Sequence, residues 1–224
     1  MTASERLDAR LTALGHPPTT TYPDLHAFGY EANMEDYRGD WALFTPLTRR
    51  GWCIHFDAEG QFFEPNEHAQ LIRAFLTLAG VQALPTVRDT WIKNVGWIME
   101  IEDGPRRVSL HVPETGLDFP SDYCELWLVK ALVEEWLSGS HVLIDPNTDD
   151  QTAFCCMMPR PIFEALCAEG FIDPDPEEPS PVNPDRMALH VSWVAEEYVE
   201  RIVRLSAEDA DAMLADAPRD WLNI

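Results

Sequence analysis

The hydrophobic pattern of the first 172 residues predicts several amphipathic helices. Leucines at positions 7, 11 and 14 follow Ser4 at helical spacing; the Ser4 hydroxyl suits a helix N-terminus and Gly15 suits the end of that helix. The same spacing predicts a second helix from Asn66 to Gly80. A third, from Asp122 to Leu137, has only a narrow polar stripe, so we expect it to be largely buried. A shorter helix is expected from Pro161 to Glu169.

A period of two between apolar residues predicts the strands. An N-terminal group covers residues 41–44, 52–56 and 62–63, with a hairpin turn at residues 57–60. Further strands are expected at residues 86–92, 96–102, 106–112, 141–144 and 152–157. Residues 16–40 have no period, and we expect their aromatic side chains to hold an irregular segment against the core.

Asp103-Gly104 is the strongest short hairpin signal in the chain. A type I′ turn at this dipeptide would place Trp97 opposite Leu110 and Met99 opposite Val108. On the other surface of the same hairpin, Glu100 would meet Arg107.

The composition changes after residue 172. Residues 173–185, DPDPEEPSPVNPD, hold five prolines and five acids, which predicts an extended, acidic Pro-rich linker between a main domain (1–172) and a C-terminal element (186–224) that packs back on it. Residues 186–205 suit either a helix or a hairpin, and we favour a hairpin that pairs 190–194 with 199–205. Ser206, with Asp209 three residues later, predicts a final helix to about Ala215.

These elements together predict an α+β fold. We expect one antiparallel sheet of about six to eight strands with helices on one face, followed by the linker and a small C-terminal α/β element. No internal repeat or coiled-coil heptad run is present in the sequence.

The charge of the chain is strongly negative. It has 16 lysines and arginines and 39 acidic residues, a net charge of −23, which disfavours direct binding to nucleic-acid phosphates. Residues 1–112 carry −5 and residues 113–224 carry −18, so the second half of the sequence holds most of the excess. Such a field attracts basic proteins. Solubility and adaptation to high salt are the alternatives, although eight tryptophans and ten phenylalanines argue against the latter.

We therefore predict a non-enzymatic binding protein that neutralises a basic protein partner, as a bacterial toxin-immunity protein or a nucleic-acid mimic does. The expected partner-binding residues are the acids of the linker and an acidic pair that follows it, namely Asp173, Asp175, Glu177, Glu178, Glu196 and Glu197. No cofactor is expected, because the sequence has no glycine-rich phosphate loop and no zinc spacing.

A hydrolase is the alternative. His55 and Asp57 are two apart on a predicted strand and share a face, as a general base and its orienting carboxylate do, and His111 lies on a later strand. No nucleophile-elbow motif accompanies them, and we favour a solvated outer face beside a hairpin turn as the explanation of His55 and Asp57.

The five cysteines are odd in number and have no CxxC spacing, which indicates buried thiols in a reducing compartment. Cys155 and Cys156 would point to opposite faces of a strand and so would not bind one metal together. Residues 145–150 begin like a calcium loop but lack its glycine and its closing glutamate. With no signal-peptide pattern and no apolar run of membrane-spanning length, the chain is expected to be cytoplasmic, with no membrane partner.

Overall fold

The structure is a computed structural model, and it describes residues 1–37, 42–57, 66–92, 95–113, 122–144, 152–173, 182–183, 188–190 and 202–215. The chain divides into two compact units, each assembled from segments that are distant in sequence. The first unit comprises Met1–Ala58, Thr77–Gly80 and Gly139–Trp193. The second comprises Glu59–Leu76, Val81–Ser138 and Val194–Ile224.

The helices and strands follow the hydrophobic pattern closely. The first unit holds the helices α1 (Ala3–Ala13), η1 (His26–Phe28), α2 (Thr45–Thr48) and α5 (Arg160–Ala168), and the strands β1 (Cys53–Asp57), β5 (His141–Ile144), β6 (Thr152–Pro159), β7 (Ile172–Asp173), β8 (Val182–Asn183) and β9 (Ala188–His190). The second holds the helices α3 (Glu67–Leu78, of which the last two residues belong to the first unit), α4 (Asp122–Trp136) and α7 (Ala207–Ala215), and the strands β2 (Thr86–Ile92), β3 (Gly96–Asp103), β4 (Arg106–Pro113) and β10 (Val203–Arg204).

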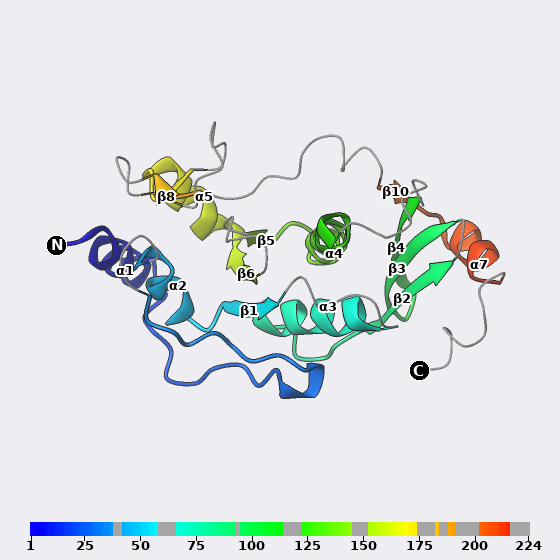
Figure 1. The fold of residues 1–224 in the computed structure, drawn as a ribbon, viewed down its shortest axis with the longest axis horizontal. Coiled ribbons are helices and arrows are strands. Elements are labelled where there is room, and N and C mark those ends of the chain that lie inside the picture. The colour runs from blue at the N-terminus through cyan, green and yellow to red at the C-terminus, as the bar shows by residue number, and fades with distance from the viewer. Residues whose placement is uncertain are drawn as a thin grey trace. The chain divides into compact units, whose positions relative to one another are not determined.

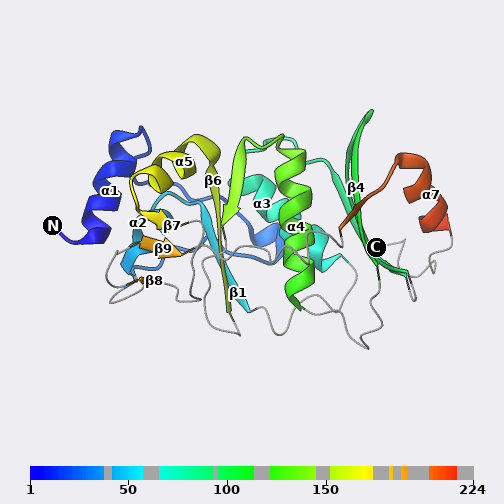
Figure 2. The same cartoon turned by 90° about the horizontal axis from the view of Figure 1, so that it is seen from above.

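The first unit is built around a three-stranded antiparallel sheet in the order β1-β6-β5, with β1 beside β6 (Figure 2). One face of this sheet packs with α1, α2 and α5 in an apolar cluster that includes Leu7, Phe44 and Phe154. Helix α1 is capped by Thr2 and not by Ser4 as predicted, because Thr2 and Glu5 satisfy each other's backbone N–H groups in a capping box.

The irregular N-terminal segment packs on the first unit through its aromatic rings, as predicted. Tyr30 lies edge-on against Phe56, and Tyr37 lies edge-on against both Phe44 and Phe154. The strand predicted at residues 41–44 is wrong, because the described part of it leads into the buried helix α2. Pro46 explains the difference, since it has no N–H to give a strand ladder and suits the first turn of a helix.

The second unit has a four-stranded antiparallel sheet in the order β10-β4-β3-β2. Helices α3 and α4 cover one face, on which His68 meets Asp89 and Trp136 meets Arg106. Helix α7 covers the other face, where Met213 and Leu214 pack with Ile92 and Ile98. Figure 1 shows α7 on the opposite side of β2, β3 and β4 from α3 and α4. The prediction of helices on one face only is therefore wrong for this sheet.

The hairpin of β3 and β4 exists, but its predicted register is wrong by two residues. Trp97 pairs with Val112 and Met99 pairs with Leu110, because the two-residue turn is Gly104-Pro105. Gly104 has a φ of +56°, whereas proline is confined to negative φ, so the turn is not type I′, which needs positive φ at both positions. A glycine with positive φ followed by proline fits type II′.

Replacing Gly104 with valine should destabilise the protein by about 1 to 3 kcal/mol, since a β-branched residue is strained at positive φ. An added Cβ would meet no atom within 4 Å, so backbone strain alone causes the loss. Asp103→Val, on the neighbouring exposed residue, should change the free energy of unfolding by no more than about 0.5 kcal/mol. Urea unfolding of both variants tests this, and equal stabilities would contradict the assigned turn.

The α+β class is confirmed, but the single sheet of six to eight strands is not. The described strands form separate antiparallel sheets of three and four strands, and β7, β9 and β8 form a small mixed sheet. The strand β1 pairs with the distant β6, so β1 and the β2–β4 meander belong to different sheets. The predicted partner of β1, residues 62–63, lies outside the described residues.

The C-terminal segment contributes to both units. Strand β9 pairs with β7 and β8, while β10 pairs with β4, so the described ends of the predicted 190–205 hairpin have other partners. Ser206 caps α7 as predicted, accepting from the Asp209 N–H at 3.1 Å. Most of the predicted linker, residues 174–181 and 184–185, lies outside the described residues, and its boundaries stay a prediction. Among the residues that are described, no helix is long and apolar enough to cross a membrane.

Candidate functional site

Of the six predicted partner-binding acids, Asp173 alone lies within the described residues. Asp173 is the half-buried last residue of β7, which pairs in parallel with β9. The other five lie outside the described residues: Asp175, Glu177, Glu178, Glu196 and Glu197. Asp173, Asp175, Glu177 and Glu178 belong to the first unit, and Glu196 and Glu197 belong to the second.

Most lysine and arginine side chains in the described part of the chain contact other groups of the protein, whereas Arg6 is exposed. Carboxylates pair with Arg10, Arg49, Arg50, Arg88, Arg107, Lys130 and Arg204. Backbone carbonyl oxygens accept hydrogen bonds from Arg73, Arg106 and Arg160. These cations therefore have partners within the protein.

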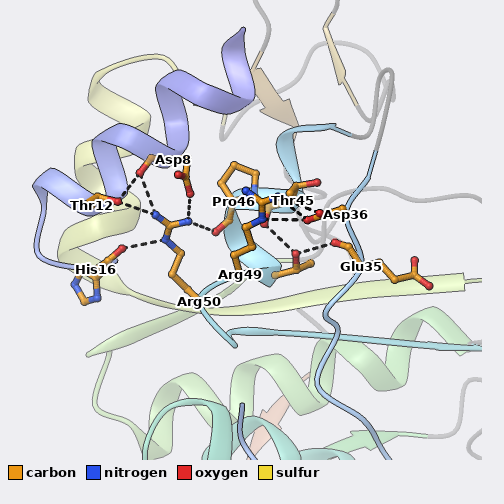
Figure 3. Close-up of polar contacts among 10 residues, drawn as sticks. Asp8, Thr12, His16, Glu35, Asp36, Thr45, Pro46, Arg49 and Arg50 are labelled. Atoms are coloured by element: carbon orange, nitrogen blue, oxygen red, sulfur yellow. Dashed lines mark hydrogen bonds and ion pairs between the residues drawn. The ribbon is translucent and has the colours of Figure 1, made fainter. Parts of the chain in front are cut away.

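Arg50 is the clearest case in the first unit (Figure 3). Its side chain is 1% exposed and forms an ion pair with Asp8. It also donates hydrogen bonds to the carbonyl oxygens of His16 at 3.0 Å and Pro46 at 2.6 Å. This guanidinium joins α1 to α2 and is not available to a ligand. Its neighbour Arg49 forms a two-pronged pair with Asp36 at the surface.

A second buried charge lies in the four-stranded sheet. Glu100 is 2% exposed, and its Oε1 accepts hydrogen bonds from Arg107 Nε at 2.9 Å and Ser109 Oγ at 2.8 Å. Arg107 also pairs with Asp211 of α7 at 2.8 Å. The predicted contact of Glu100 with Arg107 is confirmed, although Glu100 lies directly opposite Ser109 and reaches Arg107 diagonally.

Some exposed carboxylates have no cationic partner in the described part of the chain. Within the described residues, no lysine or arginine pairs with the exposed side chains of Glu35, Asp103, Glu164 or Glu208. These four residues come from both units and from loop, strand and helix. Unpaired acids are therefore distributed over the surface of each unit.

The charge excess is also shared between the units. The first has 18 acidic and 7 basic residues, a net charge of −11, and the second has 21 and 9, a net charge of −12. The two halves of the sequence differ strongly in net charge, −5 against −18, but the two units do not, because each unit contains segments from both halves. Each unit on its own would attract a cationic partner.

The residues of the alternative hydrolase prediction belong to different units. His55 is exposed on β1 and Asp57 ends that strand, both in the first unit. His111 belongs to the second unit, is 8% exposed, and its Nε2 lies 2.9 Å from the Val95 carbonyl oxygen. The hydrogen bond of His111 connects β4 to the start of β3 and is a structural contact.

A buried histidine–carboxylate pair, which the sequence analysis did not identify, lies between α3 and β2. His68 Nδ1 is 3.0 Å from Asp89 Oδ2, and the His68 backbone N–H donates to the same oxygen at 3.1 Å. Both side chains are fully buried, and Trp97 packs edge-on against the imidazole with ring centroids 4.6 Å apart. The same Asp89 oxygen is therefore shared by the backbone N–H and the imidazole ring of His68.

The chemistry of this pair resembles the orienting half of an acid–base site, but its burial makes it a structural contact. Asp89 Oδ1 and Trp97 Nε1 are buried and have no hydrogen-bond partner among the described residues. Two single polar residues 21 positions apart give no spacing motif. The available signal was an aspartate within the otherwise strand-like segment 86–92.

Metal binding has no support in the described chain, where no three histidine, cysteine or acidic residues gather closely enough to hold an ion. The calcium-like segment 145–150 lies outside the described residues. Comparison of the chain with protein-family models, with curated proteins and with solved structures found no match.

Proposed function

We propose that the protein is a non-enzymatic acidic binding protein that neutralises a basic protein partner, as a toxin-immunity protein or a nucleic-acid mimic does. The observation that supports this proposal is the distribution of charge. Most arginines and lysines of the described chain are held in contacts within the protein, while exposed carboxylates such as Glu35, Glu164 and Glu208 have no cationic partner there.

The net charge of −23 supplies the negative field that this proposal requires. A field of this kind accelerates encounter with a cationic partner and repels nucleic acids and other acidic proteins. The six predicted binding acids, Asp173, Asp175, Glu177, Glu178, Glu196 and Glu197, are proposed as the residues that contact the partner. The other five acids lie within the 24 residues that follow Asp173, which is held in β7 by the pairing of β7 with β9.

The first test identifies the partner and measures its affinity. The tagged protein is used to capture proteins from its native host, and the main captured protein is purified and titrated by calorimetry. The proposal expects a basic protein that binds with defined stoichiometry and more tightly than poly-L-lysine of similar charge. A captured protein with no basic excess, or one that binds no better than poly-L-lysine, would overturn it.

The second test asks whether the six acids form the contact. Their conversion to Asn or Gln changes the net charge from −23 to −17. A matched control removes the same charge from exposed acids elsewhere: Glu5, Glu31, Glu35, Asp103, Glu164 and Glu208. We expect at least about a tenfold loss of affinity in the first variant and a smaller loss in the control. Equal losses would mean that overall charge, and not these residues, attracts the partner.

A further inference from the structure

Two cysteines face each other across the three-stranded sheet of the first unit. The register pairs Cys53 of β1 with Cys156 of β6, and these two strands lie side by side (Figure 2). Cys155 pairs with Ile54, so its side chain points to the opposite face. The adjacent Cys155 and Cys156 are therefore kept apart, whereas two cysteines far apart in sequence are brought together.

The backbone hydrogen bonds around Cys53 and Cys156 show whether they are a hydrogen-bonded or a non-hydrogen-bonded pair of the antiparallel ladder. The Met157 N–H donates to the Trp52 carbonyl oxygen at 2.9 Å, and the Cys53 carbonyl oxygen accepts from the Asn33 N–H at 2.8 Å, on the side away from β6. Cys53 and Cys156 are thus a non-hydrogen-bonded pair, whose Cα atoms in antiparallel sheets are about 4.5 Å apart. A disulfide requires about 4.4 to 6.8 Å between the Cα atoms. A pair of this type therefore meets the backbone requirement for a disulfide.

The surroundings make this pair slow to react. Both cysteines are fully buried in the apolar cluster that contains Phe44 and Phe154. Burial, together with the contact to Cys156, raises the pKa of the Cys53 thiol well above its usual value, which disfavours the reactive thiolate. Oxidation must therefore wait for local separation of β1 and β6. Reduction of the bond, once formed, would require the same separation of the two strands.

We propose that Cys53 and Cys156 are a redox pair that forms a reversible disulfide when the protein is exposed to a peroxide. One thiol is oxidised by hydrogen peroxide to a sulfenic acid, and water is released. The sulfur of the second thiol attacks the sulfenic sulfur, the S–S bond forms, and the departing hydroxide takes the proton of that thiol as a second water. Two thiols lose two electrons and two protons, and the peroxide is reduced to two waters. This proposal does not depend on the proposed function.

The test uses the folded full-length protein incubated with hydrogen peroxide. Remaining thiols are blocked after denaturation, and peptides are mapped by mass spectrometry without reduction. We expect one disulfide that joins the peptides of Cys53 and Cys156, and its removal by dithiothreitol. Because the bond closes a long loop, the oxidised protein should melt about 10 °C higher than the reduced protein.

Cys155→Ala is the matched control, since its side chain is equally buried on the other face of β6. This variant should form the same disulfide and show the same rise in melting temperature, whereas Cys156→Ala should show neither. If Cys156→Ala does not fold, the peptide map of the parent protein decides alone. Recovery of both thiols unmodified, of sulfinic acids without a disulfide, or of a disulfide that joins other cysteines would overturn the proposal.

Discussion

Replacing Arg50 with methionine should destabilise the protein by about 3 to 5 kcal/mol, the range found when one partner of a buried charge pair is removed. The Arg50 side chain is 1% exposed, so its loss leaves Asp8 without its cation. The carbonyl oxygens of His16 and Pro46 also lose their donor. Chemical denaturation monitored by tryptophan fluorescence measures the effect.

Arg49 provides the matched control for Arg50. It is the adjacent residue and also pairs with an aspartate, but its side chain is 46% exposed and Asp36 is 64% exposed. Solvent already screens such a pair, so Arg49→Met should cost no more than about 1 kcal/mol. If the two substitutions were equally harmful, the buried contacts of Arg50 would not be what joins α1 to α2.

Truncation of Leu132 or Trp136 to alanine should each cost about 2 to 5 kcal/mol through lost burial and a residual cavity. Both lie on α4, with exposed fractions of 0% and 7%. Trp136 also carries the Arg106 guanidinium over its ring, 4.1 Å from the centroid. Urea titration compares each variant with the parent.

Glu134 is the control on the same helix. It lies on the polar stripe between these two residues and pairs with Lys130 at 3.6 Å, one helical turn away. An i,i+4 pair of this kind contributes only about 0.3 to 0.5 kcal/mol, so Glu134→Ala should leave stability nearly unchanged. A loss comparable to that of Trp136→Ala would mean that the buried face of α4 is assigned wrongly.

Local patterns predicted the elements whose stability depends on nearby residues. The periodicity of α4 and the cap of α7 at Ser206 both hold in the structure. Local patterns could not predict which distant strands pair, because nothing near Cys53 in the sequence indicates that β1 pairs with β6. The turn was missed for a local reason: Pro105 excludes type I′ and moves the register by two residues.

The candidate site was less predictable than the fold. Composition pointed to the acids near Asp173, but it did not show that arginines such as Arg50 and Arg107 are held by internal carboxylates. Nor did the −18 of the second half of the sequence indicate that the two units carry nearly equal charge. Both findings depend on which segments fold together, which no motif in the sequence specifies.

The rate of association with the captured basic partner tests the central proposal most directly. Stopped-flow measurements from about 0.05 to 0.5 M salt shorten the electrostatic screening length from roughly 14 to 4 Å. The parent protein should associate markedly more slowly at high salt, with a smaller change in dissociation. The variant that lacks the six predicted binding acids should associate slowly at every salt concentration. A variant that associates as fast as the parent at low salt would contradict the proposal.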